Sequence, residues 1–207
     1  LRPSLVRSYS LSGPPGAAEY RISVKREPHG AGSGYLTTRV HVGDTIDVAA
    51  PRGTFLLQSG TAPVLLVSGG VGATPVLAML RALAGEPSTR EVWWLQAARN
   101  SSERPFAAEA AELIATLPHA RSHVCFSRPL STDVAGRDYD SVGHLTAELL
   151  RGLDLPRDAE AYLCGPAGFL VDVTAALVDA GVAAPRIHTE VFGSLPALTP
   201  GIAPAPA

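Results

Sequence analysis

The chain has 207 residues, a formal net charge of −2 and 46% hydrophobic residues, a composition typical of a globular protein with a buried core and not of a disordered chain. The nearly balanced charge provides no field that would attract nucleic acid or an anionic membrane surface. The two cysteines, Cys125 and Cys164, are too few for a disulfide framework, a zinc site or an iron–sulfur cluster, which takes four thiolates.

The first residues of the chain do not have the pattern of an export signal. The chain opens with Leu1 and has no basic segment followed by an apolar one, so we expect a piece of a longer, cytoplasmic protein. Residues 64–84 are apolar enough to suggest a membrane span, but Ser68, Gly72 and Pro75 interrupt the run. Such interruptions argue against a transmembrane helix.

Residues 1–57 have the pattern of a β region. The stretches "LVRSYSLS" (5–12) and "EYRISVKR" (19–26) each alternate polar and apolar residues, with "GPPG" (13–16) between them as a turn. The stretch "GDTIDVAAPRGTF" (43–55) then predicts a turn, a short strand, a Pro-Gly break and the start of another strand.

From residue 63 onward, short apolar runs alternate with amphipathic segments. The predicted strands are 63–68, 91–98, 121–127, 160–165 and 186–192, and the predicted helices are 74–85, 104–117, 143–152 and 166–181. This alternation predicts βαβ units with right-handed crossovers. We expect an α/β doubly wound, five-stranded parallel sheet of order 3-2-1-4-5. Residues 194–207, rich in proline and alanine, are interpreted as a linker.

Two glycine–proline loops follow the first and fourth predicted strands. In residues 69–75, "GGVGATP", Thr74 is expected to cap a helix whose first residue is Pro75. Residues 163–169, "LCGPAGF", repeat the arrangement. In the predicted strand order both loops fall at the topological switch point, where open α/β sheets bind ligands. Bare backbone at a helix N-terminus suits a pyrophosphate; the alternative is that both are simply tight turns.

Five motifs, taken together, resemble the ferredoxin–NADP reductase superfamily of flavin-dependent NAD(P)H oxidoreductases. "GGVGATP" resembles its nicotinamide pyrophosphate loop, and "CGPAGF" (164–169) its C-G-P motif near the nicotinamide. "RSYS" (7–10) is similar to its flavin motif R-x-Y-S, "GAGS" (30–33) followed by "GYL" to its flavin phosphate segment, and "HTEVFG" (188–193) to its C-terminal E-x-F segment.

The resemblance implies an organisation and a set of site residues. Residues 1–58 would be a partial, antiparallel, flavin-binding β-barrel, residues 59–193 the NAD(P)-binding α/β domain, and 194–207 the linker. The implied catalytic residues are Ser10, Cys164 and Glu190. The implied cofactor-binding residues are Arg7, Tyr9, Ser10, Gly30, Ser33, Gly34, Tyr35, Gly69, Gly70, Gly72, Thr74, Pro75, Arg99, Arg128, Cys164, Gly165, Pro166 and Phe192.

The residue types suit these roles. Arg7 offers a bidentate fork for a flavin phosphate, Tyr9 a flat face for the flavin ring, and Ser10 a hydroxyl for its edge. Simpler alternatives stay open: Arg7 and Tyr9 as a cation–aromatic pair on a strand, Cys164 as an ordinary buried cysteine, and Glu190 as an exposed carboxylate at a strand end.

The implied activity is that of an NAD(P)H-dependent flavoprotein reductase, which passes electrons to a ferredoxin-type iron–sulfur domain or to a haem or oxygenase domain, in the same longer polypeptide. We expect FAD, with FMN left open. Arg99 and Arg128 lie where they would hold the 2′-phosphate of NADPH, or equally contact the adenosine or a diphosphate, so the sequence does not decide between NADH and NADPH. Another hypothesis is a truncated, non-catalytic docking or regulatory relative with the same fold.

Overall fold

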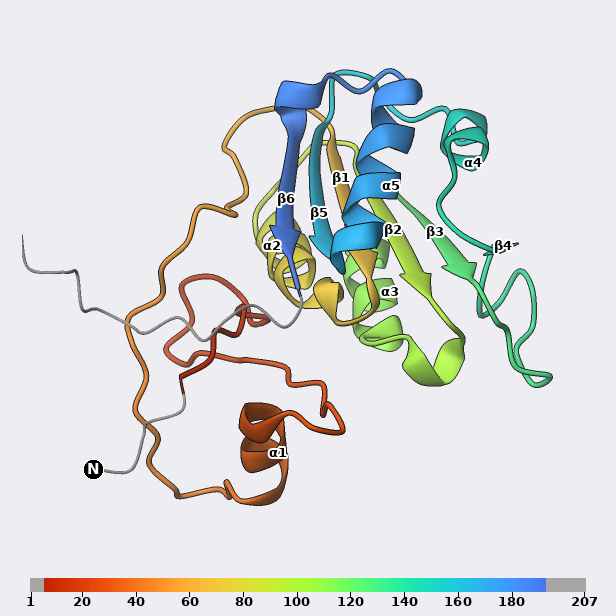
Figure 1. Ribbon diagram of the computed structural model, residues 1–207. Helices are drawn as coiled ribbons and strands as arrows, with labels where there is room; N and C mark the ends of the chain where they lie inside the picture. The colour runs from red at the N-terminus through yellow and green to blue at the C-terminus, as the bar shows by residue number, and fades with distance from the viewer. Residues whose placement is uncertain (1–5, 193–207) are drawn as a thin grey trace, which may run out of the picture.

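A computed structural model describes residues 6–192, which form an α/β region preceded by an N-terminal region (Figure 1). The α/β region is a six-stranded sheet of order β4-β3-β2-β1-β5-β6, and every strand pair in it is parallel. The strands are β1 (Val64–Gly69), β2 (Val92–Ala98), β3 (Ala120–Phe126), β4 (Ser141–Val142), β5 (Glu160–Gly165) and β6 (Ile187–Val191).

Helices cover both faces of this sheet. On one face pack α2 (Ala73–Gly85) and α3 (Ala107–Thr116), and on the other α4 (Ala147–Gly152) and α5 (Ala167–Asp179). The side chains of β1 alternate between the two cores, Leu65 and Val67 facing α5 while Val64 and Leu66 face α2. Burial on both faces is why β1 is apolar throughout rather than alternating. In β2, likewise, Trp93 belongs to the core on the α5 side and Trp94 to the core on the α2 side.

The predicted doubly wound sheet is confirmed with one addition. The five longer strands have the expected order, but β4, a two-residue strand that the sequence did not predict, pairs with Cys125 and Phe126 at the edge of β3. Contacts of Ser141 hold it there, since its Oγ lies 2.9 Å from His123 Nε2 and 3.1 Å from Cys125 Sγ. A strand of two residues is too short to show a periodicity from which it could be predicted.

The N-terminal region, residues 6–63, differs from the prediction. Among the described residues it has one antiparallel bridge, Leu11 with Ile22, and no antiparallel barrel. It also contains a helix, α1 (Ala31–Thr38), in a segment predicted as β, after which the chain runs in an extended path to β1 (Figure 1). Alternating residues form a ladder only where a partner strand lies alongside, and here the pairing stops at that bridge. The predicted linker 194–207 lies outside the described residues.

Three long-range hydrogen bonds and one aromatic contact place the end of the N-terminal region on the sheet. Gln58 N donates to Tyr162 Oη at 2.8 Å, and the Arg90 guanidinium donates to the carbonyls of Gln58 and Ala62. Phe55 packs edge-on against Tyr162, with ring centroids 6.0 Å apart.

A membrane crossing would require a longer or more apolar helix than any found in residues 6–192.

Candidate functional site

The two glycine–proline loops meet at the carboxyl end of the sheet. They follow β1 and β5, which are neighbours in register, with Ser68 opposite Cys164. A Cβ added at Gly72 would overlap the carbonyl of Cys164 and lie 2.8 Å from Gly165 N. Only glycine permits this approach, so the loops form one surface of nearly bare backbone, as the sequence predicted.

Phe169 packs across both loops. A Cβ at Gly69 would lie 3.0 Å from Phe169 Cγ, and one at Gly165 2.7 Å from Phe169 Cδ1. The glycines therefore make room for the aromatic ring, which is held against the ends of β1 and β5. Phe169 belongs to the motif "CGPAGF", but no role was predicted for it.

The start of α2 differs in detail from the prediction. Gly70–Gly72 form a 3-10 turn in which Gly70 has φ +55, a conformation that glycine adopts without strain. The helix follows directly at Ala73 with Gly72 as its N-cap. Thr74 is therefore not the cap; it lies inside the first turn, where its hydroxyl donates to Val71 O at 3.2 Å. Pro75 follows in that turn, which tolerates proline because its N–H groups lack helical partners.

The loop after β5 is closer to expectation. Pro166, in extended conformation, is the N-cap of α5, which begins at Ala167. A cavity of about 180 Å³ adjoins this helix start and the end of β2. It is lined by Ala97, His144, Leu145, Phe169, Asp172 and Val173. No sequence signal could have located it, because three distant segments form its wall.

A polar row crosses the sheet just below the loops. Gln96, Ser68, Cys164 and Glu190 occupy paired positions on β2, β1, β5 and β6, and paired residues of parallel strands share a face. Ser68 is fully buried, and its Oγ is the buried side-chain oxygen that has no hydrogen-bond partner in residues 6–192. No role in a site was predicted for Ser68, although a serine that ends the run "VLLVS" is a visible signal.

The predicted catalytic residues are brought together in this row. The Ser10 hydroxyl donates to Glu190 Oε1 at 3.4 Å, although 180 residues separate the two. Cys164 is opposite Glu190 in the register of β5 and β6. Burial, with the nearby Glu190 carboxylate, strongly raises the pKa of the Cys164 thiol, which therefore stays protonated. Burial also raises the pKa of Glu190, and the Ser10 hydrogen bond partly opposes this.

The predicted flavin motifs also lie together. A Cβ at Gly32 of α1 would lie 2.9 Å from Arg7 Cγ and 3.4 Å from Tyr9 Oη, so the "RSYS" segment rests on the helix that starts in "GAGS". Burial of Tyr9 raises the pKa of its hydroxyl, partly opposed by the charge of Arg7. The Arg7 side chain is exposed and donates to Val6 O at 2.7 Å.

The hydroxyl of Ser33 has a structural role. It accepts from Glu27 N at 3.1 Å and donates to Gly30 O at 3.2 Å, which closes the turn before α1. A Cβ at Gly30 would collide with this Oγ. Gly34 has open space around it, and Tyr35 is exposed, so α1 presents both to solvent.

The remaining candidates lie beside the loops. Arg128 N donates to Arg99 O at 2.8 Å, which joins the segments that follow β3 and β2. The Arg99 guanidinium pairs with Glu103 at 3.3 Å and is exposed, as is Arg128. Phe192 N donates to Gly165 O at 2.8 Å, and the Phe192 side chain packs against the core that contains Cys164.

Comparison with known proteins gives a consistent result. A family model described as oxidoreductase NAD-binding domain matches residues 66–175. The chain is 43% identical over 197 residues to a flavohemoprotein of Deinococcus radiodurans, an alignment that covers 95% of this chain and 49% of the relative. The chain spans about half the length of the curated relatives it matches.

Two solved structures are similar along most of the chain. One is the flavohem-like FAD/NAD binding domain of nitric oxide dioxygenase from Vibrio cholerae O1 biovar El Tor, with a TM-score of 0.78, 40% identity, and coverage of 90% of this chain and 77% of that one. The other is a flavohemoglobin from Malassezia yamatoensis with bound FAD and heme, with a TM-score of 0.70, 28% identity, and coverage of 89% and 46%.

Proposed function

The chain belongs to the oxidoreductase NAD-binding domain family, as a flavohaemoprotein-like reductase module of the ferredoxin–NADP reductase superfamily, and we propose that it takes hydride from NAD(P)H to FAD and passes the electrons to a haem partner. The observation that carries the proposal is the meeting of Ser10, Cys164 and Glu190 directly beside two loops of bare backbone. When bound, FAD supplies the conversion of a two-electron hydride into single electrons.

The dinucleotide is assigned to the α/β region, residues 59–193. The backbone of Gly69, Gly70 and Gly72 carries no Cβ, and the 3-10 turn Gly70–Gly72 leads directly into α2, so the positive end of the helix dipole lies at this bare loop, a combination suited to a pyrophosphate. Gly165 and Pro166 form the other wall. The cavity beside Phe169 and the exposed guanidinium groups of Arg99 and Arg128 offer room and charge for the adenosine end. Thr74 and Pro75 are buried and act by shaping the turn.

The flavin is assigned to residues 1–58, as the resemblance implies, with help from Phe192. Arg7 and Tyr9 lie against the glycine-rich start of α1, so a cation, an aromatic ring and bare backbone share one surface, which fits a flavin with its phosphates. Because the Ser33 hydroxyl closes the turn, we assign phosphate contacts to the backbone near Gly30 and Gly34 rather than to that hydroxyl. The exposed ring of Tyr35 is assigned to the same surface.

Side chains of this protein would surround the reacting groups and hold a proton near them. Cys164, kept neutral by burial, adds no charge beside the reacting nicotinamide. Ser10 and Glu190 share a hydrogen bond through which a proton can be held or moved at Glu190 Oε1. The apolar side chain of Phe192, which packs against the core that contains Cys164, excludes water, which would otherwise compete for the hydride.

The electron acceptor is assigned from the relatives. The Malassezia protein was solved with FAD and heme, and the flavohemoprotein relatives are about twice as long as the aligned chain. A haem domain in the same polypeptide is therefore the favoured partner; a ferredoxin-type iron–sulfur domain is the alternative acceptor.

The test is spectroscopic. The full-length protein should be purified with flavin absorbance and should bleach under anaerobic conditions on addition of NADH or NADPH. Titration with each nucleotide in turn then gives the preference for NADH or NADPH. The Cys164→Ala variant should slow bleaching about tenfold or more while changing the nucleotide Kd less, because the thiol lies at the reacting end. A protein that binds flavin but does not bleach, or binds none, would instead indicate the non-catalytic relative.

A further inference from the structure

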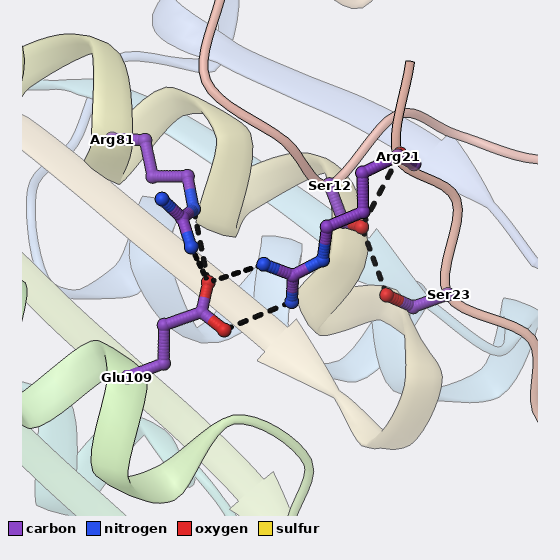
Figure 2. Close-up of polar contacts among 5 residues, drawn as sticks. All are labelled: Ser12, Arg21, Ser23, Arg81 and Glu109. Atoms are coloured by element: carbon purple, nitrogen blue, oxygen red, sulfur yellow. Dashed lines mark hydrogen bonds and ion pairs between the residues drawn. The ribbon is translucent and has the colours of Figure 1, made fainter. Parts of the chain in front are cut away.

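An ion-pair cluster joins the N-terminal region to two helices of the α/β region (Figure 2). Arg21 donates to both carboxylate oxygens of Glu109, from Nη1 at 3.1 Å and Nη2 at 2.8 Å. Glu109 lies in the first turn of α3, and Arg81 of α2 donates to it through Nε at 2.9 Å. One carboxylate thus accepts from two guanidinium groups, in a forked geometry stronger than a single-point contact.

Arg21 is part of a small, ordered unit. Ser12 N donates to Arg21 O at 2.8 Å, Leu11 pairs with Ile22, and the hydroxyls of Ser12 and Ser23 lie 2.8 Å apart (Figure 2). Residues 11–23 are therefore held as one piece, which we call the 11–23 turn. The Arg21 guanidinium also lies over the ring of Phe106, 5.6 Å from its centroid.

The 11–23 turn is adjacent to the catalytic candidates. Ser10 directly precedes it and donates to Glu190. Within residues 6–192, Arg21–Glu109 is the ion pair that connects the segment before residue 60 to the α/β region; the other two ion pairs of that segment, Lys25–Glu27 and His41–Asp44, are internal to it. This ion pair therefore ties the segment that carries Ser10 to the start of α3.

We propose that Glu109, by holding Arg21 and Arg81 together, is a positioning residue that sets Ser10, and with it the flavin surface, against Cys164 and Glu190. This inference rests on the proposed reductase function. Glu109 touches none of the reacting groups and acts entirely through the 11–23 turn. A displacement of about 1 Å between reacting groups is enough to slow a reaction by up to about 100-fold.

The carboxylate of Glu109 remains ionised across the neutral range. Partial burial by itself raises its pKa, but the hydrogen bonds from Arg21 and Arg81, with their charges, outweigh that effect and leave the pKa below its usual value. The Glu109→Gln substitution keeps the shape and removes the charge, so both guanidinium groups lose their counter-ion. The side chains are 39%, 25% and 23% exposed for Arg21, Glu109 and Arg81, so added salt should weaken the native cluster partly.

The experiment compares Glu109→Gln and Arg21→Gln with the control Asp179→Asn. Asp179 pairs with Arg151 on the surface at 3.3 Å, both side chains more than half exposed, so the control removes an ion pair that anchors nothing at the site. Three properties are measured on the flavin-loaded, full-length proteins: hydrogen exchange of residues 8–24, the Kd for NADH or NADPH, and the rate of anaerobic flavin reduction at saturating nucleotide.

We expect faster exchange across residues 8–24 and an about tenfold slower reduction in both variants, with the nucleotide Kd changed less than about twofold, because the nucleotide loops lie outside the cluster. The double variant should be no slower than either single one, since both remove the same interaction. Raising salt from about 0.05 M to about 0.5 M should slow the parent protein and leave Glu109→Gln unaffected.

Two results would overturn the inference. If exchange of residues 8–24 in Glu109→Gln matches that of the parent and Asp179→Asn, the cluster does not anchor the turn. If reduction keeps its rate while only the Kd rises, Glu109 acts on nucleotide binding rather than on positioning. Neither result touches the proposed function, which fails only if the parent protein itself does not bleach.

Discussion

The α/β region and the N-terminal region of this chain are held in place by different forces. Every buried apolar side chain of the core among the described residues lies at or beyond Val64, whereas the buried side chains before it are Ser12 and Ser33. The α/β region therefore has a hydrophobic core of its own. The N-terminal region is attached to that core by polar contacts, namely Arg21 with Glu109, Ser10 with Glu190, and Gln58 with Tyr162, and by the partly buried side chains of Phe55 and Leu57 at its end.

This difference places the functional chemistry at a boundary. The bare loops and Cys164 belong to the rigid region, and their geometry follows from close packing. Ser10, Arg7 and Tyr9 belong to the region held by hydrogen bonds and charges, whose individual contributions are smaller and depend on salt and pH. Substitutions at the loop glycines should therefore lower stability most, and substitutions at Arg7 and Tyr9 should mainly affect cofactor binding.

The largest effect is expected at the contact between the two loops. Gly72→Ala places a Cβ onto the Cys164 carbonyl, and backbone at both sides must move. We expect a loss of about 3 kcal/mol or more in the free energy of unfolding, measured by denaturant titration.

The matched control for this substitution is Gly168→Ala. It adds the same methyl group in α5, where nothing lies within 4 Å of the new Cβ. It should be neutral or stabilising by up to about 1 kcal/mol, because alanine is the better helix former. Equal stabilities for the two variants would mean that the loops do not meet as described.

The contrast between the buried α/β region and the N-terminal region also explains which features the sequence could predict. The five longer strands, their order and the four helices were predicted because apolar periodicity is local and each of these elements is buried by its neighbours. The family resemblance, based on five motifs, is confirmed by the match over 66–175 and by the 40% identical Vibrio domain. The prediction that Thr74 is the N-cap of the first helix was wrong, because the sequence does not reveal that a 3-10 turn continues directly into the helix.

Other features have no local signal. Helix α1 contains two glycines, which lower helix propensity, and two threonines, Thr37 and Thr38, whose hydroxyls donate to backbone carbonyls four residues earlier, which does not favour a helix either. The cluster of Arg21, Arg81 and Glu109 joins three segments whose spacing shows no pattern. Even the meeting of Ser10 with Glu190 was expected only through the family resemblance, since no periodicity relates residues so far apart.

The second largest effect is expected from a substitution at the proposed flavin surface of the N-terminal region. Arg7→Ala removes an exposed guanidinium while Gly32 and α1 remain in place. Loss of one charge-assisted contact to a phosphate is worth about 1.5–3 kcal/mol, so the flavin Kd should rise about 10- to 100-fold. Titration of flavin fluorescence measures this change.

The control for Arg7 is Arg52→Ala, which removes an equally exposed cation from the same region. Its flavin Kd should stay within about twofold of the parent value, because bulk charge alone is screened at ordinary salt. If both substitutions weaken flavin equally, Arg7 contributes only to the general field and the surface formed by "RSYS" and α1 is not the flavin site.

The smallest effect concerns the hydrogen bond that links the two regions at the catalytic candidates. Burial raises the pKa of Glu190 in the folded protein, and the Ser10 hydrogen bond opposes this. The folded state then holds the carboxyl proton more tightly than the unfolded state does. Stability must fall as pH rises from the unfolded pKa of about 4.3 through the folded pKa, and it changes no further above that.

Glu190→Gln removes this titration, so its stability relative to the parent should improve with rising pH across that window and then remain constant. Ser10→Ala removes the hydrogen bond that opposes the rise in the pKa of Glu190. The pH range over which stability falls should therefore extend to higher pH, and the total loss of stability should be larger. Both are measured as free energies of unfolding between about pH 4 and about pH 8. If Ser10→Ala instead follows the parent curve at every pH, Ser10 and Glu190 do not interact, and the hydrogen-bonded region is not joined to the packed one at this point.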